Sequence, residues 1–383
     1  MPALVALSYL SLLVLGLIDN IRGPLFPEIL QDMQLGGTNG SAFFAATSLF
    51  AFIGSWSSHA LVERRSSLSL MRLSCLGLAL GFALVALCHV YALMLAACAF
   101  FGWAFGALNL AQNLMVFEGS PAHLRRRFFS GLHSMYGLAA LLAPLVATLF
   151  RSMGMDWRQI VLWLAGLPVL LVVTSAKMTH RPSAHSQTQG TMGAEEWRRC
   201  LVFSMMMAGY LWGEISVSTR LVLWLRTSEN FAPDLANLYL TGFFVTLLAG
   251  RLVFSFFPIH GISNWAVLWI SAGLSALLYG LTLSHHPAWI LLAGLSMAPF
   301  FPVAMDQVSV LFPGKSAQAL GFVLGFGSLS VVVMHLSIGW LTDQYGVGTA
   351  LRIGPTTLLL IFMALTGLVV RQRSLQRAES KAL

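Results

Sequence analysis

The stretch GLIDNIRGPLFP at residues 16–27 decides the fold, because it carries two charges inside an apolar run that extends from Leu4 to about Leu30. Such a run is long enough to cross a bilayer, which takes about 20 apolar residues in a helix. Asp19 falls about 22 Å along that helix at roughly 1.5 Å per residue, within the hydrocarbon or near its far edge. A charge at that depth costs several kcal/mol unless it is paired or hydrated.

Two explanations account for Asp19. In the first, which we adopt as the prediction, the carboxylate faces a water-accessible cavity and takes part in function, as ionisable residues within membranes usually do. In the second, Asp19 and Arg22 lie three residues apart on one helix face and neutralise each other as a fixed pair. Pro24 and Pro27 cannot donate helical hydrogen bonds, so the sequence predicts a kink or a helix end just beyond the acid.

The composition is that of a polytopic membrane protein. Of the 383 residues, 57% are hydrophobic and only 9% are charged, whereas a soluble globular protein carries about 25% charged residues. The net charge of +8 would suit a nucleic-acid partner. However, the Lys and Arg residues stand in short loops between apolar runs, as the positive-inside rule expects, and we predict no such partner. The first run lacks a basic flank and a small-residue cleavage site, so we interpret it as a membrane span and not as a signal peptide.

Twelve apolar runs predict an all-α membrane protein with twelve transmembrane helices in two six-helix bundles. The predicted spans are 4–30, 40–62, 68–88, 91–117, 128–150, 158–177, 199–226, 236–257, 262–284, 287–312, 316–341 and 346–371. The polar segment 178–198 predicts a flexible cytoplasmic linker between an N-terminal bundle, 1–177, and a C-terminal bundle with a short tail, 199–383. Most Lys and Arg residues fall on one side, which predicts that both termini are cytoplasmic.

The two halves of the chain echo each other. Asp19 and Glu214 are separated by the same number of residues as Phe117 and Phe312, which open the triplets Phe-Glu-Gly and Phe-Pro-Gly. Because both residue pairs have the same separation and the two halves have matching hydropathy patterns, the sequence predicts a parallel repeat of six spans. Glu214 is thus expected at nearly the depth of Asp19.

Several short motifs occur in a fixed order along most of the length. They are GxxDNxxGxxxP at 16–27, Asn113 in the fourth span, GLHSMYG at 131–137, Tyr210 before Glu214, Gly250-Arg251-Leu252, and APFFP at 298–302. In this order they resemble the major facilitator superfamily, and more closely its fucose–galactose/glucose permease branch. The resemblance implies two six-helix bundles around a central cavity, and sugar–proton symport. Asn109 stands where that family often has an acid, so the family's proton site does not carry over simply.

Polar side chains inside the predicted spans are the candidates for binding. Glu214 can hold a proton, pair with a cation or accept hydrogen bonds from a hydroxyl-rich ligand, and its alternative is a fixed pair with Arg220 or Arg251. Amides recognise a neutral polar solute without charge, although they can instead join helices. The predicted substrate-binding residues are Asp19, Asn20, Arg22, Asn109, Gln112, Asn113, His133, Tyr210, Trp212 and Glu214, of which Asp19 and Glu214 also couple the ion.

The arginines within the spans have two explanations each. Arg251 and Asp306 are predicted to form a gating or structural pair. Arg22 and Arg220 either draw an anionic substrate into the outer cavity or pair internally with Asp19 and Glu214, and internal pairing is the prediction we adopt.

These patterns predict a secondary-active transporter, a monomer in the bacterial inner membrane. It would move a small polar solute such as a sugar by alternating access, coupled to a proton or to sodium. The alternatives are an exporter of a siderophore or drug, and a non-transporting sensor or assembly factor. The sequence shows no phosphate-binding loop, no metal-spaced His/Cys set and no catalytic triad, so we expect no ATP drive, cofactor, metal or enzymatic activity.

Overall fold

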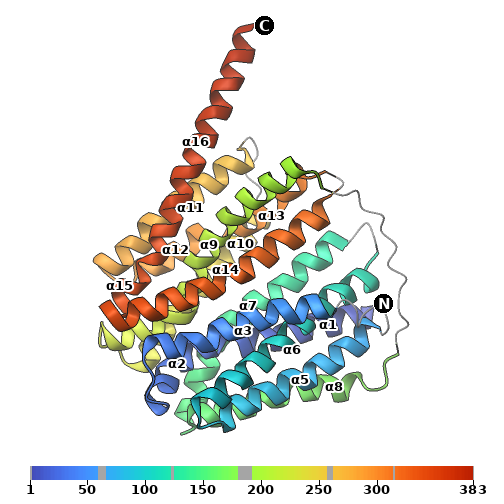
Figure 1. Cartoon of the computed structure of the whole chain (residues 1–383), viewed down its shortest axis with the longest axis vertical. Coiled ribbons are helices and arrows are strands. Elements are labelled where there is room, and N and C mark those ends of the chain that lie inside the picture. The colour runs from blue at the N-terminus through green and yellow to red at the C-terminus, as the bar shows by residue number, and fades with distance from the viewer. Residues whose placement is uncertain are drawn as a thin grey trace. The chain divides into compact units, whose positions relative to one another are not determined.

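The structure, a computed structural model, describes residues 2–58, 66–121, 125–179, 192–256, 262–313 and 315–382, and every regular element within these ranges is a helix. The helices, shown in Figure 1, are α1 (Pro2–Asn20), α2 (Arg22–Asp32), α3 (Gly37–Ser57), α5 (Ser67–Leu87), α6 (Tyr91–Gly119), α7 (Arg125–Ser152), α8 (Trp157–Ser175), α9 (Ala194–Thr227), α10 (Pro233–Phe256), α11 (Asn264–Ser284), α12 (Trp289–Met297), α13 (Phe300–Leu311), α14 (Ser316–Tyr345), α15 (Val347–Leu351) and α16 (Ile353–Ala382).

The described residues contain eleven helical segments that are long and apolar enough to cross a membrane. Three of them combine two helices, α1 with α2, α12 with α13, and α15 with α16. The predicted span 40–62 corresponds to α3, which is not among the eleven. Small and polar residues at both ends of α3 lower its mean hydropathy. With α3, the described residues contain all twelve predicted passes as helices, and the chain is a multi-pass membrane protein.

The first pass is broken at Ile21, between α1 and α2, just beyond Asp19, where the sequence predicts a kink or a helix end. Pro24 has no N–H for the carbonyl of Asn20 four residues earlier, and its ring crowds that carbonyl, so the helix is disturbed one turn before the proline. Regular bonding then resumes, because the Leu25 N–H donates to the Ile21 carbonyl at 3.2 Å and Pro27 lies inside α2. The break therefore follows Asp19 directly.

By their contacts, the described residues form two compact units. The first comprises 1–187, 219–241 and 331–347, and the second comprises 188–218, 242–330 and 348–383. The first unit thus holds α1 to α8 together with end portions of α9, α10 and α14. One boundary, between 187 and 188, falls inside the predicted linker, and the others cut through helices of the C-terminal half. Residues 180–191 of that linker lie outside the described ranges, and its last residues already belong to α9. The two six-helix bundles stay a prediction.

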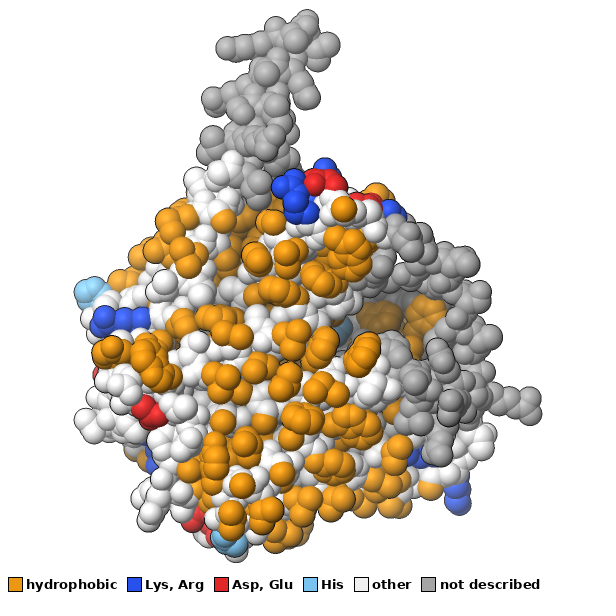
Figure 2. All heavy atoms as spheres, in the orientation of Figure 1, with side chains coloured by type: hydrophobic (Ala, Val, Ile, Leu, Met, Phe, Trp, Pro, Cys, Tyr) orange, Lys and Arg blue, Asp and Glu red, His pale blue; other side chains and the backbone are white. Residues whose placement is uncertain are grey.

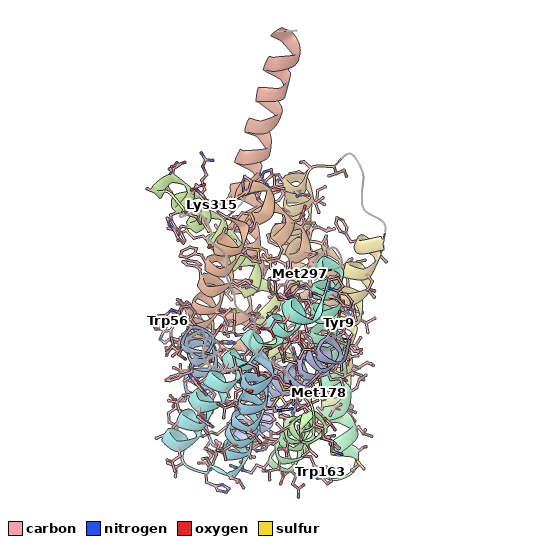
Figure 3. The ribbon with its side chains drawn as sticks, turned by 90° about the vertical axis from the view of Figure 1, so that its right-hand side faces the viewer. Tyr9, Trp56, Trp163, Met178, Met297 and Lys315 are labelled. Atoms are coloured by element: carbon pink, nitrogen blue, oxygen red, sulfur yellow. The ribbon has the colours of Figure 1, made fainter. Side chains whose placement is uncertain are left out.

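The outer surface of the helices is apolar. Large hydrophobic side chains that are more than a third exposed occur on most helices, and Figure 2 shows hydrophobic side chains spread over the visible face. Trp56 is 74% exposed and Trp163 is 66% exposed, and both lie at the margin of the ribbon in Figure 3. A surface of this kind would aggregate in water, which indicates that it faces lipid.

Close packing of α3 against α6 depends on glycine. A Cβ atom at Gly106 would lie 1.8 Å from the carbonyl oxygen of Ala51, and one at Gly54 would lie 2.0 Å from that of Trp103. Small residues let backbones approach where lipid supplies no hydrophobic drive for helix association. The helix α6 also packs against α5 and α1. The crossing with α3 therefore helps to fix the position of α6, which carries the predicted amides.

We expect Gly106→Ala to lower the melting temperature of the purified protein, because the added methyl group meets backbone and overpacking of this kind costs about 1–3 kcal/mol. Gly166→Ala on α8 is the matched control, since nothing lies within 4 Å of its Cβ position and alanine favours the helix by ~1 kcal/mol. Equal melting temperatures for the two variants would contradict a tight crossing.

Candidate functional site

Asp19, at the C-terminal end of α1, receives hydrogen bonds from a tyrosine and an arginine. The Tyr136 hydroxyl on α7 donates to Asp19 Oδ2 at 2.5 Å, and Arg22 Nη2 donates to Asp19 Oδ1. Arg22 Nη1 also donates to Thr47 Oγ1 on α3 at 3.0 Å. We call these four residues the Asp19 cluster. Of the two explanations for Asp19, the ion pair with Arg22 is the one that the structure contains.

The Asp19 cluster is not sealed from solvent. The Asp19 side chain is 21% exposed and that of Arg22 is 16% exposed. Arg22 also lines a cavity of about 30 Å³ together with Phe26, Phe44 and Cys98 and other apolar side chains. The surface of this cavity is apolar, and apolar cavities stay dry. The partial exposure of the two side chains themselves lowers the cost of keeping both charges within the membrane.

Glu214, on α9 in the second unit, is held by a tyrosine and an arginine in the same way. Arg251 Nη2 on α10 donates to Glu214 Oε1 at 3.1 Å and to Oε2 at 3.0 Å. The Tyr210 hydroxyl donates to Glu214 Oε2 and lies 3.2 Å from the Met297 carbonyl at the break between α12 and α13. The Tyr210 ring stacks on Phe300 with its centroid 4.3 Å away. We call Tyr210, Glu214, Arg251 and Phe300 the Glu214 cluster.

The Glu214 cluster corrects two pairings expected from the sequence. Arg251 forms its ion pair with Glu214 and not with Asp306, whose Oδ2 accepts a hydrogen bond from Asn264 at 3.1 Å. Arg220 was expected to pair with Glu214, but its hydrogen bonds go to Ser41 and to the Thr219 carbonyl. Sequence spacing places both acids inside apolar spans, whereas it cannot show which helix faces meet.

Two of the remaining predicted residues, Asn109 and Asn113, bind each other. Asn113 Nδ2 donates to Asn109 Oδ1 at 3.0 Å, whereas Gln112 is fully buried and its amide has no partner among the described residues. Asn20 Nδ2 donates to the Gly16 carbonyl at 2.9 Å and Trp212 Nε1 to the Ser330 carbonyl at 3.0 Å. His133 lies exposed on α7. The role of these side chains in binding stays a prediction.

A third group of contacts joins the two halves of the sequence inside the first unit. Glu28 on α2 binds Arg151 on α7 at 2.8 Å and also binds Arg226 on α9. Asn237 Nδ2 on α10 donates to Thr148 Oγ1 on α7 at 3.0 Å.

The Asp343 carboxylate near the end of α14 accepts from the Gly37 N–H and, at 2.8 Å, from the Thr38 N–H. It therefore caps α3, whose own N-cap residue, Gly36, provides no side-chain hydrogen bond. We call the pairs of Glu28 with Arg226, Asn237 with Thr148, and Asp343 with the start of α3 the closure contacts.

Comparison with solved structures identifies the fold. A variant of the nucleoside transporter NupG superimposes with a TM-score of 0.78 and 14% identity over 95% of this chain and 99% of that one. The D-xylose–proton symporter gives 0.74 and 16% over 94% and 96%. The human organic anion transporter MFSD10 gives 0.67 and 16% over 94% and 98%. The chain has the major facilitator fold, which these transporters share.

Sequence comparison gives a partial match. No protein-family model matches the chain. The sodium-dependent glucose transporter 1 of the rat is 28% identical over 144 residues, which cover 36% of this chain and 28% of that protein. The chain is thus similar over part of its length to a sugar transporter.

For the Glu214 cluster we expect Glu214→Gln and Arg251→Gln each to destabilise the protein by about 2–3 kcal/mol, because each leaves one charge of a largely buried pair without its partner. The double variant should lose clearly less than the sum of the two single losses. The measurement is thermal unfolding of the purified variants in detergent. Strict additivity would show that the pair contributes no coupling energy.

For the cap of α3 we expect Asp343→Ala to lower the stability by about 0.5–2 kcal/mol, the usual effect of losing an N-cap side chain. Asp343→Asn should lose less than the alanine variant, because its one amide oxygen can still accept from one of the two N–H groups that the carboxylate binds. Thermal unfolding of both variants tests this. If the asparagine variant were as unstable as the alanine variant, the carboxylate would not act as a cap.

Proposed function

We propose that this protein is a secondary transporter that moves a small polar, sugar-like solute across the bacterial inner membrane by alternating access. The fold supports this proposal, because its structural neighbours are by name a nucleoside transporter and a D-xylose–proton symporter. The partial sequence match to a sodium-dependent glucose transporter points to the same class of solute. In this proposal the protein is a monomer of the fucose–galactose/glucose permease branch, with both termini in the cytoplasm.

One observation carries the proposal. Each half of the chain keeps one carboxylate at an equivalent sequence position inside a span, bound by a tyrosine hydroxyl and an arginine, and both carboxylates remain about one fifth exposed. Ionisable residues held in this way within a membrane mark substrate and ion pathways. A pair with only a structural role would stabilise the fold no more than well-packed apolar residues in its place, because the desolvation cost of two buried charges offsets their attraction unless the geometry is ideal.

The two clusters supply a mechanism of coupling. A cation that enters a cluster, either a proton or sodium, competes with the arginine for the carboxylate and frees the guanidinium and the tyrosine hydroxyl. Those freed donors can then bind hydroxyl groups of the solute. Coupling requires that the cation and the solute bind one conformational state better than the other. The closure contacts would belong to one of these states, because they join segments of both sequence halves through bonds that can be exchanged for water.

The test is uptake by liposomes that contain the purified protein, with D-xylose, D-glucose, uridine and D-glucuronate as labelled neutral and acidic solutes and with pH and sodium gradients imposed separately. We expect Glu214→Gln and Asp19→Asn to abolish gradient-driven uptake and to retain solute exchange, because the amides keep hydrogen-bonding capacity but cannot take up the coupling cation.

Glu195→Gln is the matched control on the same helix, since Glu195 pairs with exposed Arg198 and Arg199, and it should transport like the unmodified protein. Unchanged gradient-driven uptake in Glu214→Gln would remove that residue from coupling. Absence of flux for every solute under every gradient would argue against transport of sugar-like solutes.

A further inference from the structure

Arg220 on α9 is a buried cation that the proposed mechanism does not use. Arg220 is 1% exposed. Nη2 donates to Ser41 Oγ on α3 at 2.8 Å, and Nη1 donates to the Thr219 carbonyl at 3.1 Å. The guanidinium carbon lies 4.3 Å from the ring centroid of Phe26 and 4.7 Å from that of Phe44. Among the described residues, its partners are thus a hydroxyl, a carbonyl and two aromatic faces.

The carboxylates on the surrounding elements are already bound to other groups. Asp19 binds Arg22 and Tyr136, Glu28 binds Arg151 and Arg226, and Asp343 binds the start of α3. None of these described acids forms an ion pair with Arg220. The guanidinium therefore keeps a full charge in a low-dielectric site, where cation–π attraction compensates only part of the desolvation cost.

The surroundings of Arg220 add positive charge and an unused nitrogen. The guanidinium carbon of Arg22 lies 5.1 Å from the Phe44 centroid, so Phe44 contacts two arginines. The His335 ring on α14 stacks on the same phenyl ring at 5.1 Å. His335 is 3% exposed, and its Nδ1 atom has no hydrogen-bond partner among the described residues. The group of Arg22, Arg220 and His335 around Phe44 is suited to an anion.

We propose that Arg220 binds a negatively charged group, a carboxylate or a phosphate, on the transported solute when the closure contacts open. This inference rests on the proposed function and specifies its substrate class, a polar organic anion. A planar guanidinium fork matches carboxylate and phosphate oxygens in two parallel hydrogen bonds, which are stronger than a bond to a hydroxyl. An anion therefore binds Arg220 more strongly than Ser41 and the phenyl rings do, and its binding favours the open state.

The first test requires no knowledge of the solute. Ser41 is fully buried, so Ser41→Cys in a protein whose Cys75, Cys88, Cys98 and Cys200 are replaced by serine reacts with thiol reagents only after opening. An anionic methanethiosulfonate should label it about 30-fold faster than a cationic one of equal size, because unit charges about 4 Å apart in water attract the first and repel the second by about 1 kcal/mol each. Arg220→Gln should abolish that preference and Arg220→Lys should retain it. Equal rates for both reagents in the Arg220 protein would overturn the anion site.

The second test compares neutral solutes with their acids on the full chain without the cysteine changes. The pairs are D-glucose with D-glucuronate, D-galactose with D-galacturonate, and D-ribose with ribose 5-phosphate, and inorganic phosphate distinguishes a free anion from a solute-borne group. We expect at least one acid to raise the melting temperature while its neutral partner and inorganic phosphate do not. Arg220→Gln should lose that shift, whereas Arg199→Gln, which alters an exposed arginine on the same helix, should keep it.

The outcomes separate the two proposals. A shift by neutral sugars alone, by inorganic phosphate alone, or by no probe overturns the anion site, and so does a shift that survives Arg220→Gln. An acid that shifts the unmodified protein through Arg220 but is not carried into liposomes under any gradient supports the anion site and overturns transport. Arg220→Lys keeps the charge and controls for misfolding. If the lysine variant retains both the response to the acid and the closed-state protection of Ser41→Cys, the loss in Arg220→Gln reflects the missing charge. A misfolded variant would lose that protection.

Discussion

The structure depends on one constraint, the cost of holding a charge within hydrocarbon. The chain meets it in two different ways. Asp19 and Glu214 are each compensated by an arginine and a tyrosine hydroxyl, and both acids keep some access to water. Arg220 is compensated only by a hydroxyl, a carbonyl and two aromatic faces, and it is fully buried. The first solution gives a stable neutral pair, whereas the second leaves a charge that a ligand can complete.

The two acid clusters are equivalent in composition and different in construction. Arg22 follows Asp19 on the next turn, and Tyr136 comes from another helix. In the second half the tyrosine precedes Glu214 by one turn and the arginine comes from another helix. Only the acid is shared by the repeat. The same combination of acid, tyrosine and arginine is thus built from different positions in the two halves.

The closure contacts connect the fold to the proposed mechanism. They are one ion pair, one side-chain hydrogen bond and one helix cap, each worth little on its own and each replaceable by water. Glycines at the same place, Gly37 and Gly339, bring α3 and α14 so close that an added Cβ would lie within 3 Å of the opposite helix. Contacts of this kind hold two segments in register without committing the protein to one state, as alternating access demands.

The sequence by itself determined the twelve passes, the presence of one acid within a pass of each half and a helix break just beyond Asp19. These follow from local patterns, because hydropathy, proline and charge act over one helix at a time. The break follows Asp19 because a proline disturbs the carbonyl four residues before it. The sequence wrongly assigned Asp306 to Arg251 and an acid to Arg220. Only the tertiary structure decided that Tyr136 binds Asp19, that Arg251 binds Glu214 and that Arg220 lies between phenyl rings, because partners from distant segments depend on which helix faces meet.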